Sequence, residues 1–295
     1  PSSLPAWAIG VRLYGRYVGL LAPGAGCTRG LRSLLLDGLD RVVHAEAAAL
    51  QEGASWSVHP QAAIGESFSQ RLLRECGVWV HLFAALDAEA AISTPSFVDL
   101  LLHVLEVLPM LTWGAPSAQA AFASAVGHEK MLQLLLLSGK PVGQPVIARV
   151  FDWFAGAPAQ VDHECAARTP LGTRRDRRAF AWSAGHASIV QVGEVSSLLL
   201  ALLPQTDDEL QLAMLQRLGT LLDASILNRS RGSELRLLRG MLQLLLNPLS
   251  EATQRALLRA LTPLASHSVS VSELKLLFGL LAHQPTEATD GGGVL

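Results

Sequence analysis

The sequence predicts an all-α fold, and three observations support this prediction. Leu is the most frequent of the 295 residues, whereas Phe, Trp and Tyr number only 8, 6 and 2, a balance that favours helices over strands. Apolar residues recur at helical spacing in blocks that are separated by polar breaks. Residues typical of helix caps stand at the start of several blocks. The length allows one large or two ordinary domains with a substantial core.

The first helical block is predicted over residues 30–156, after an irregular N-terminal segment at 1–29. A clear start signal within it is Thr94-Pro95, because Thr caps a helix and Pro at the first helical position loses no hydrogen bond. The predicted helices span 30–50, 70–86 with Gly77 as a weak point, 96–111, 116–139 as two helices that meet near Gly127, and 145–156.

Residues 157–185 are predicted to be a loop or a linker, because helical periodicity stops there and charge rises. This stretch contains the one dense basic run of the chain, formed by Arg174, Arg175, Arg177 and Arg178 around Asp176. The run is interpreted either as the solvated surface of a linker or as a contact for an anionic partner. That partner would be the phosphates of lipid or RNA, or an acidic protein.

The second helical block is predicted over 186–284, and a flexible tail follows at 285–295. Its predicted helices span 186–204 (or two helices broken at Gly193), 207–225, 233–247, 251–267 and 270–282. Thr206 and Glu209 match the S/T-x-x-E pattern of a capping box, so they are expected to open the second of these helices.

The last helix is predicted from SVSVSELKLLFGLL at 268–281, which begins with a strand-like alternation and continues with helical spacing. Ser270 and Glu273 form a capping box, in which each side chain accepts a hydrogen bond from the backbone N–H of the other residue. Val269 and Leu274 match the hydrophobic staple that accompanies such a cap, which places Leu274 on the inner face. These signals favour a helix over a strand.

The spacing of the helices predicts how they are arranged. Helix starts in the second block lie roughly 15 to 25 residues apart, so two helices make a unit of about 40, the size of armadillo and HEAT repeats. Some helices are apolar most of the way round, such as MLQLLLN at 241–247, and must lie between other helices. A closed bundle would satisfy this pattern too. An armadillo/HEAT-like α-solenoid is favoured, because five or more helix pairs cannot easily share one core.

Charge and cysteine content limit the class of partner and the compartment. The net charge of −2 gives no overall field that attracts nucleic acid or anionic lipid, so no specific nucleic acid partner is expected. The sequence has no uninterrupted run of about 18 apolar residues, the length that spans a membrane. Cys27, Cys76 and Cys165 are widely spaced, without a C-x-x-C pair or a secretory signal, which favours a reducing cytoplasmic compartment.

No catalytic, metal-binding or cofactor-binding site is expected, so the chain is predicted not to be an enzyme. Gly24, Gly26 and Gly30 resemble a phosphate loop, but no Lys follows and the spacing is one residue too long for a dinucleotide site. The consecutive side chains of His-Glu-Cys at 163–165 diverge, and zinc would need two further ligands at recognisable spacing. An enzyme within a helical bundle remains the alternative from another functional class.

Two segments, IVQVGEVSSLLLALL at 189–203 and LASHSVSVSELKLLFGLL at 264–281, resemble the helical region of neurobeachin and the neurobeachin-like BEACH-domain proteins. The resemblance covers about residues 186–284. It implies an armadillo-like α-solenoid within a large, non-catalytic intracellular scaffold of vesicle and membrane traffic. It also implies protein partners or adjacent domains of the same chain. The implied location is the cytoplasm. Any association with endomembranes would come through the rest of the protein.

The predicted terminal helix carries the candidate contact residues. A terminal repeat normally presents a polar outer face, yet Leu277, Phe278 and Leu281 keep this helix apolar on the side predicted to face outward. Exposed apolar patches of this kind mark interfaces, so these residues are expected to contact the next domain. The alternative function is that of an armadillo-type adaptor for a cargo peptide or an anionic partner, which would need a charged inner groove.

Overall fold

The structure is a computed structural model that describes residues 6–23, 28, 30–39, 41–42, 68–92, 94–112, 115–139, 141–155, 189 and 192–282. Helix accounts for 84% of the described residues, and no strand occurs among them, which confirms the all-α prediction. The predicted linker at 157–185, with Arg174, Arg175, Arg177 and Arg178, lies outside the described residues. The predicted tail at 285–295 does so too.

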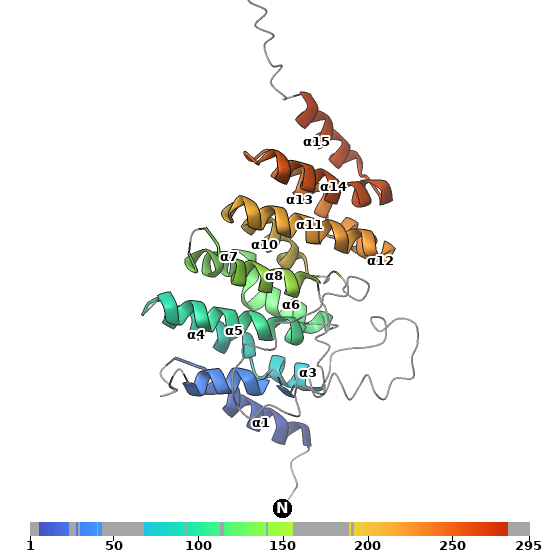
Figure 1. The fold of residues 1–295 in the computed structure, drawn as a ribbon. Helices are drawn as coiled ribbons and strands as arrows, with labels where there is room; N and C mark the ends of the chain where they lie inside the picture. Colours follow the sequence, from blue (N-terminus) through green and yellow to red (C-terminus); the bar gives the residue numbers. More distant parts are fainter. Residues whose placement is uncertain are drawn as a thin grey trace, which may run out of the picture.

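The helices stack along one direction, from α1 at one end to α15 at the other (Figure 1). Their bounds are α1 Ala6–Gly19, α3 Phe68–Glu75, α4 Val78–Ala90, α5 Thr94–Thr112, α6 Pro116–Ala125, α7 Gly127–Leu137, α8 Gln144–Ala155, α10 Gly193–Leu202, the 3-10 turn η2 Leu203–Gln205, α11 Asp208–Ala224, α12 Ile226–Glu234, α13 Leu237–Leu244, α14 Glu251–His267 and α15 Val271–Ala282. A further helical segment covers 30–39 and 41–42.

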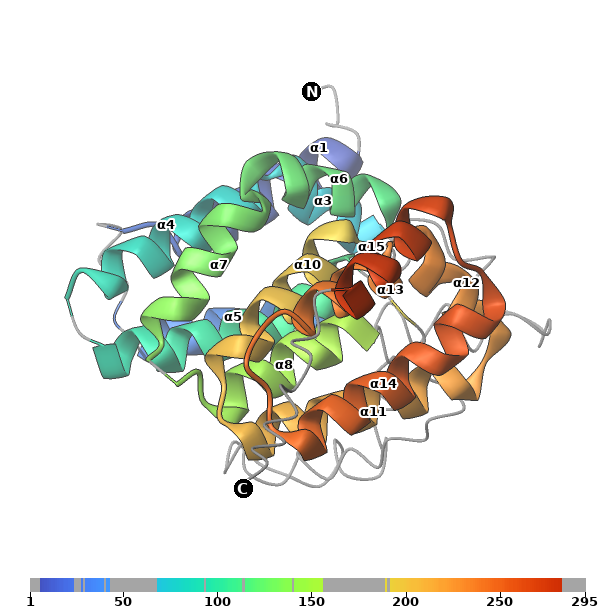
Figure 2. The same cartoon turned by 90° about the horizontal axis from the view of Figure 1, so that it is seen from above.

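Most of these helices belong to two rows that run along the stack. In one row α5 packs on α8, α8 on α11 and α11 on α14; in the other, α7 packs on α10, α10 on α13 and α13 on α15. The view along the stack shows α11 and α14 superposed, with α13 and α15 beside them (Figure 2). Each internal helix of a row is therefore covered by a neighbour on two sides, which explains why several helices are apolar most of the way round.

A unit of three helices recurs in the stack, with two shorter helices followed by a longer one. The units are α3–α4–α5, α6–α7–α8 and α12–α13–α14. In each unit the first two helices meet at a residue in the left-handed region, which is Gly77 (φ 69°), Gly127 (φ 74°) or Arg236 (φ 56°). A left-handed residue ends one helix and redirects the chain into the next. The helices α10 and α11 take the corresponding places between the second and third of these units.

Two predicted helices are wrong because a positive-φ residue divides each of them, whereas several predicted helix boundaries are confirmed. The predicted helix at 70–86 is divided at Gly77, and the predicted helix at 233–247 is divided at Arg236, because a positive φ cannot continue a right-handed helix. The predicted junction near Gly127 and the predicted start at Thr94 are both confirmed. Likewise, the predicted helices at 145–156 and 251–267 correspond to α8 and α14.

The first residues of the chain do not match the prediction of an irregular segment at 1–29, because α1 lies within it. Val18 and Leu21 are fully buried, and the Tyr17 hydroxyl donates to the carbonyl oxygen of Leu35 at 2.6 Å. A Cβ at Gly38 would collide with that hydroxyl. Helical spacing of apolar residues is therefore present in this segment, although its glycines and prolines obscure it.

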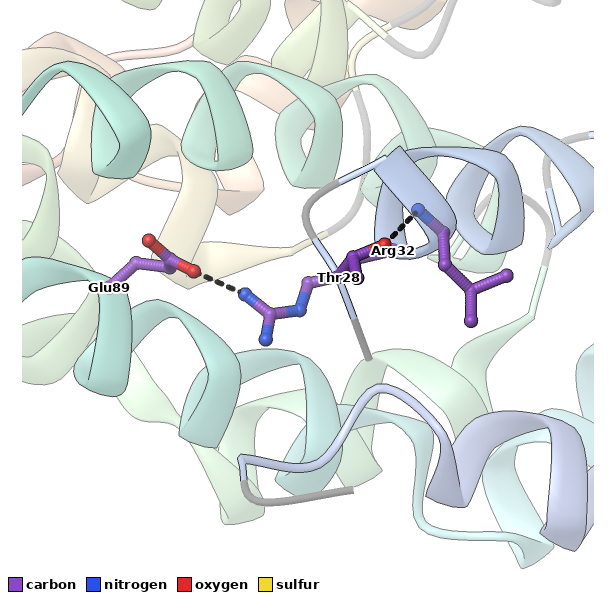
Figure 3. A network of polar contacts seen from close by, with 4 residues as sticks. Thr28, Arg32 and Glu89 are labelled. Carbon is purple, nitrogen blue, oxygen red and sulfur yellow. Dashed lines mark hydrogen bonds and ion pairs between the residues drawn. The ribbon is translucent and has the colours of Figure 1, made fainter. Parts of the chain in front are cut away.

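The helix over 30–39 is capped at Thr28 and is linked to α4 by an ion pair (Figure 3). The Thr28 hydroxyl accepts a hydrogen bond from the backbone N–H of Leu31 at 3.3 Å, which caps this helix. Arg32 then reaches Glu89 of α4, with 2.5 Å between Nη1 and Oε1. Both side chains are largely buried, so loss of one partner would leave an uncompensated charge in a poorly solvated place.

Aromatic side chains fill the core where the first two units meet. The ring of Phe122 on α6 lies edge-on to Trp79 of α4 and to Trp153 of α8, with centroid distances of 5.4 and 5.1 Å. The indole N–H of Trp153 donates to the hydroxyl of Thr112 at 2.9 Å. That hydroxyl in turn donates to the carbonyl oxygen of Leu108 at 2.9 Å. The Trp153 indole and the Thr112 hydroxyl are thus satisfied, whereas the buried indole N–H of Trp79 has no hydrogen-bond partner among the described residues.

The helix α5 meets the length and composition of a membrane span over Pro95–Thr112, and 56% of that window is buried inside the structure. It packs between α4 and α8, and its exposed or half-buried positions include Asp99 and Glu106. Glu106 forms an ion pair with Arg149 of α8, with 2.5 Å between the charged atoms. Its packing is that of a core helix within the stack.

Polar contacts fix Ile189, at the start of the second block, against the helices that follow. The side-chain oxygen of Asn228 accepts from the backbone N–H of Ile189 at 3.3 Å. Arg231 donates to the carbonyl oxygen of Ile189 at 3.2 Å. The amide of Asn228 also donates to the carbonyl oxygen of Leu221 at 2.8 Å. Since Ile189 and Asn228 are both buried, this contact fixes the chain against α11 and α12.

The predicted capping box at the start of α11 is wrong by one residue. The cap is Asp207, whose carboxylate accepts from the backbone N–H of Leu210 at 2.8 Å. Thr206 instead turns its hydroxyl back to the carbonyl oxygen of Leu203 at 2.8 Å. A carboxylate next to the positive end of the helix dipole is the stronger capping group.

Candidate interaction surface

The cap of α15 determines how this last helix is oriented on the stack. The backbone N–H of Ser270 donates to Oε2 of Glu273 at 2.7 Å, and the backbone N–H of Glu273 donates to Oγ of Ser270 at 3.3 Å. The predicted capping box is therefore confirmed in both directions. Glu273 is 8% exposed, so the side of the helix that carries this residue faces the stack.

The inner side of α15 is the side that carries Glu273. Leu276 and Leu280, at i+3 and i+7 from Glu273, pack against the core, and the helix contacts α13. The prediction that Leu274 lies on the inner face is wrong, because this side chain is 40% exposed. A residue one position after the buried Glu273 is rotated by about 100° around the helix, which takes Leu274 away from the stack.

The outer side of α15 forms the candidate interaction surface, which we call the α15 outer face. It consists of Val271, Leu274, Leu277 and Phe278, with exposed fractions of 70%, 40%, 36% and 65%. Val271, Leu274 and Phe278 stand at i, i+3 and i+7, so they form one stripe along the helix. Single exposed apolar residues need no explanation, but four on one helix form a patch of the kind found at interfaces.

The neighbouring helix α14 extends the exposed apolar character of this end of the stack. Ala260 of α14 packs on α11, where a Cβ at Gly219 would lie 3.6 Å from it. Leu258, which lies nearly opposite Ala260 around the helix, is 54% exposed. The helices α14 and α15 lie at the same end of the stack (Figure 1), and each carries exposed large apolar side chains.

Basic side chains accompany the apolar ones at this end. Lys275 stands between Val271 and Phe278 on the outward side of α15, and Arg259 follows Leu258 on α14; both are exposed. Neither cation has an ion-pair partner among the described residues. Arg255, by contrast, pairs with Glu251 of its own helix. The end of the stack thus combines an apolar stripe with two uncompensated positive charges.

Of the three residues predicted for an interdomain contact, the structure describes the side chains of two. Phe278 and Leu277 lie together on the α15 outer face, as predicted for exposed residues. Leu281 lies within α15, but its side chain is outside the described residues. Sequence reasoning missed Val271 as a member of the stripe. The signal for it was present, because the capping box fixes Ser270 as the cap and hence Val271 as the first helical residue.

The described residues hold no cluster of metal-ligating side chains. No group of three or more His, Cys, Asp or Glu side chains that could hold a metal ion occurs among them. Cys76 is a free thiol, and burial, with a smaller contribution from Glu75, raises its pKa, which disfavours the nucleophilic thiolate. The His-Glu-Cys segment at 163–165 and the glycines Gly24 and Gly26 lie outside the described residues.

Comparison with models of protein families, with curated proteins and with solved structures gives no match to this chain.

Proposed function

We propose that this chain is a non-catalytic α-solenoid segment of the armadillo/HEAT type that serves as a scaffold in membrane trafficking, similar to the helical region of the neurobeachin-like BEACH proteins. The α15 outer face supports the scaffold role, since it offers an apolar contact surface at the end of the stack. In this role the segment contacts an adjacent domain or a protein partner. Its compartment is the cytoplasm, and endomembranes are reached through the rest of the protein.

The solenoid part of the proposal is supported by the recurring unit of three helices. Three junctions with positive φ stand at the same place in the unit, between its first and second helices. Helices of the same place in successive units pack on one another, as α11 does on α14. A stack in which each unit contacts mainly its neighbours is the defining feature of solenoid proteins, whereas a closed bundle gathers its helices around one shared core.

Proximity labelling in cells tests the scaffold role. The full chain, fused to a biotin ligase, is compared with its Phe278→Ser variant, and the labelled proteins are quantified. We expect a set of trafficking proteins that Phe278→Ser reduces, because this side chain is the most exposed aromatic group of the α15 outer face. Identical labelling by both chains, or enrichment confined to proteins of another compartment, would contradict the proposal.

A further inference from the structure

The α15 outer face has the geometry of a surface that receives a helix. Val271, Leu274 and Phe278 form a stripe at i, i+3 and i+7, the spacing with which two helices pack against each other. The stack itself shows how such a face is covered, because α15 lies on α13 and packs Leu276 and Leu280 against the core. A further helix on the α15 outer face would continue an arrangement that the molecule already uses.

The charges at this end indicate the chemistry of that helix. Lys275 projects from the same side of α15 as Val271 and Phe278, and Arg259 of α14 is a second cation without a partner among the described residues. Because complementary charges around an apolar contact fix its register and exclude wrong partners, the matching helix carries acidic residues beside its apolar stripe.

The same charges argue against a second copy of this chain as the occupant. Pairing two copies through α15 would bring Lys275 of each copy toward the other. Stacking the α1 end of one copy on the α15 end of another is also unfavourable, because α1 exposes Arg12 and Arg16 beside Leu13. Either arrangement places like charges around the apolar contact, which is unfavourable.

From these observations we infer that the α15 outer face binds an amphipathic helix whose apolar stripe is flanked by Asp or Glu. The inference rests on the proposed function and names the partner of the same surface. The partner helix lies along α15, with its apolar side chains against Val271, Leu274 and Phe278 and its carboxylates near Lys275 and Arg259. This helix belongs to another protein or to another domain.

Fluorescence anisotropy with two synthetic helices tests this inference. The full chain is titrated into a labelled peptide of about 20 residues, long enough to form a helix, with Leu at helical spacing and Glu on both flanks. A second peptide has the same apolar stripe and Lys in place of each Glu. We expect the acidic peptide to bind about tenfold more tightly than the basic one, and added salt to reduce this difference.

Three variants locate the contact. Phe278→Ser is expected to abolish binding, and Lys275→Glu to weaken the acidic peptide about fivefold while improving the basic one. Val80→Ser is the matched control, because Val80 is 62% exposed on α4, away from α15; it should leave binding unchanged. Equal loss of binding in the Val80→Ser and Phe278→Ser variants would overturn the inference.

The remaining outcomes separate this inference from the proposed function. If both peptides bind equally, or the basic peptide binds better, and binding still depends on Phe278, the acidic partner is wrong while the protein-binding role stands. If light scattering shows a dimer that Phe278→Ser dissolves, the occupant is a second copy. If neither peptide binds and phosphatidylserine vesicles bind through Lys275, the surface contacts lipid, and both the inference and the proposed function fail.

Discussion

Across the first turn of α15, the backbone N–H of Ser270 donates to the carboxylate of Glu273 at 2.7 Å, and the backbone N–H of Glu273 donates to the hydroxyl of Ser270 at 3.3 Å. The Ser270 hydroxyl also donates to the same carboxylate oxygen at 2.6 Å. A local pattern of four residues thus defines where the helix begins. It also indicates which side of the helix faces α13, because Glu273 is buried while Ser272 and Leu274, the residues beside it in the chain, are exposed.

Removing the cap is expected to loosen α15 without affecting the rest of the stack. Ser270→Ala should reduce the stability of this helix by about 1 kcal/mol, the usual loss for a helix cap. Amide hydrogen exchange over 271–282 measures the effect. Ser272→Ala is the matched control, because Ser272 is exposed in the first turn and its hydroxyl bonds only to that of Ser270. Unchanged protection in Ser270→Ala would show that the cap does not hold the helix.

Substitutions at the positive-φ junctions give a second prediction, because the free energy of unfolding should rise at Arg236 and fall at the two glycines. Arg236→Gly should raise the free energy of unfolding by up to about 1 kcal/mol, because Gly adopts a positive φ without strain. Gly77→Ala and Gly127→Ala should lower it by about 1 kcal/mol or more. A Cβ at either glycine meets no atom within 4 Å, so only backbone strain acts. Urea unfolding of the three variants would reveal the signs, and a loss of stability in Arg236→Gly would contradict the account.

Two helical glycines of the second block provide a third prediction. A Cβ at Gly232 would lie 2.8 Å from Leu264, which must move, whereas at Gly219 the nearest atoms are at an ordinary 3.6 Å. Gly232→Ala should therefore destabilise the chain by about 1–3 kcal/mol. Gly219→Ala should stabilise it by up to about 1 kcal/mol through helix propensity. Thermal melts that rank the two variants in the reverse order would show that α11, α12 and α14 do not pack as described.

Alkaline pH provides a fourth prediction, through Tyr17. Burial raises the pKa of this phenol, and the charges of Asp37 and Tyr14 add to the shift. A pKa that is higher in the folded state contributes stability below the unfolded value of 10.0. This contribution is lost as pH rises through the folded value. Unfolding free energies should therefore fall above about pH 10, and less so in Tyr17→Phe. A parallel fall in both proteins would assign the effect to other groups, such as Cys76.

Local signals in the sequence predicted much of the fold, because they act within one turn of chain. The Ser270 cap and the start of α5 at Thr94 depend only on neighbouring residues, and both are confirmed. Features that depend on packing were harder to predict. Arg236 adopts a positive φ although Arg is a good helix former, so nothing in its own chemistry marks the junction between α12 and α13.

The candidate surface shows the same division between local and tertiary information. The exposure of Phe278 agrees with the prediction, but the staple pattern alone predicts an inward-facing Leu274, and this side chain is exposed. Which leucines of an apolar helix face inward depends on where the neighbouring helix lies. Here Glu273 is buried, and Leu276 and Leu280, on the same side of α15, pack against the core.

Amide hydrogen exchange of α15 in Phe278→Ser and Leu276→Ser tests most directly the claim that α15 packs through one side and leaves the other free for a partner. Leu276→Ser should remove an apolar side chain that packs against the core, lower the stability of α15 by about 2 kcal/mol and strip its amides of protection. Phe278→Ser should change that protection by less than about 0.5 kcal/mol, as expected for an exposed position. If Phe278→Ser strips the protection of α15 as fully as Leu276→Ser does, Phe278 belongs to the core and the α15 outer face is not a contact surface.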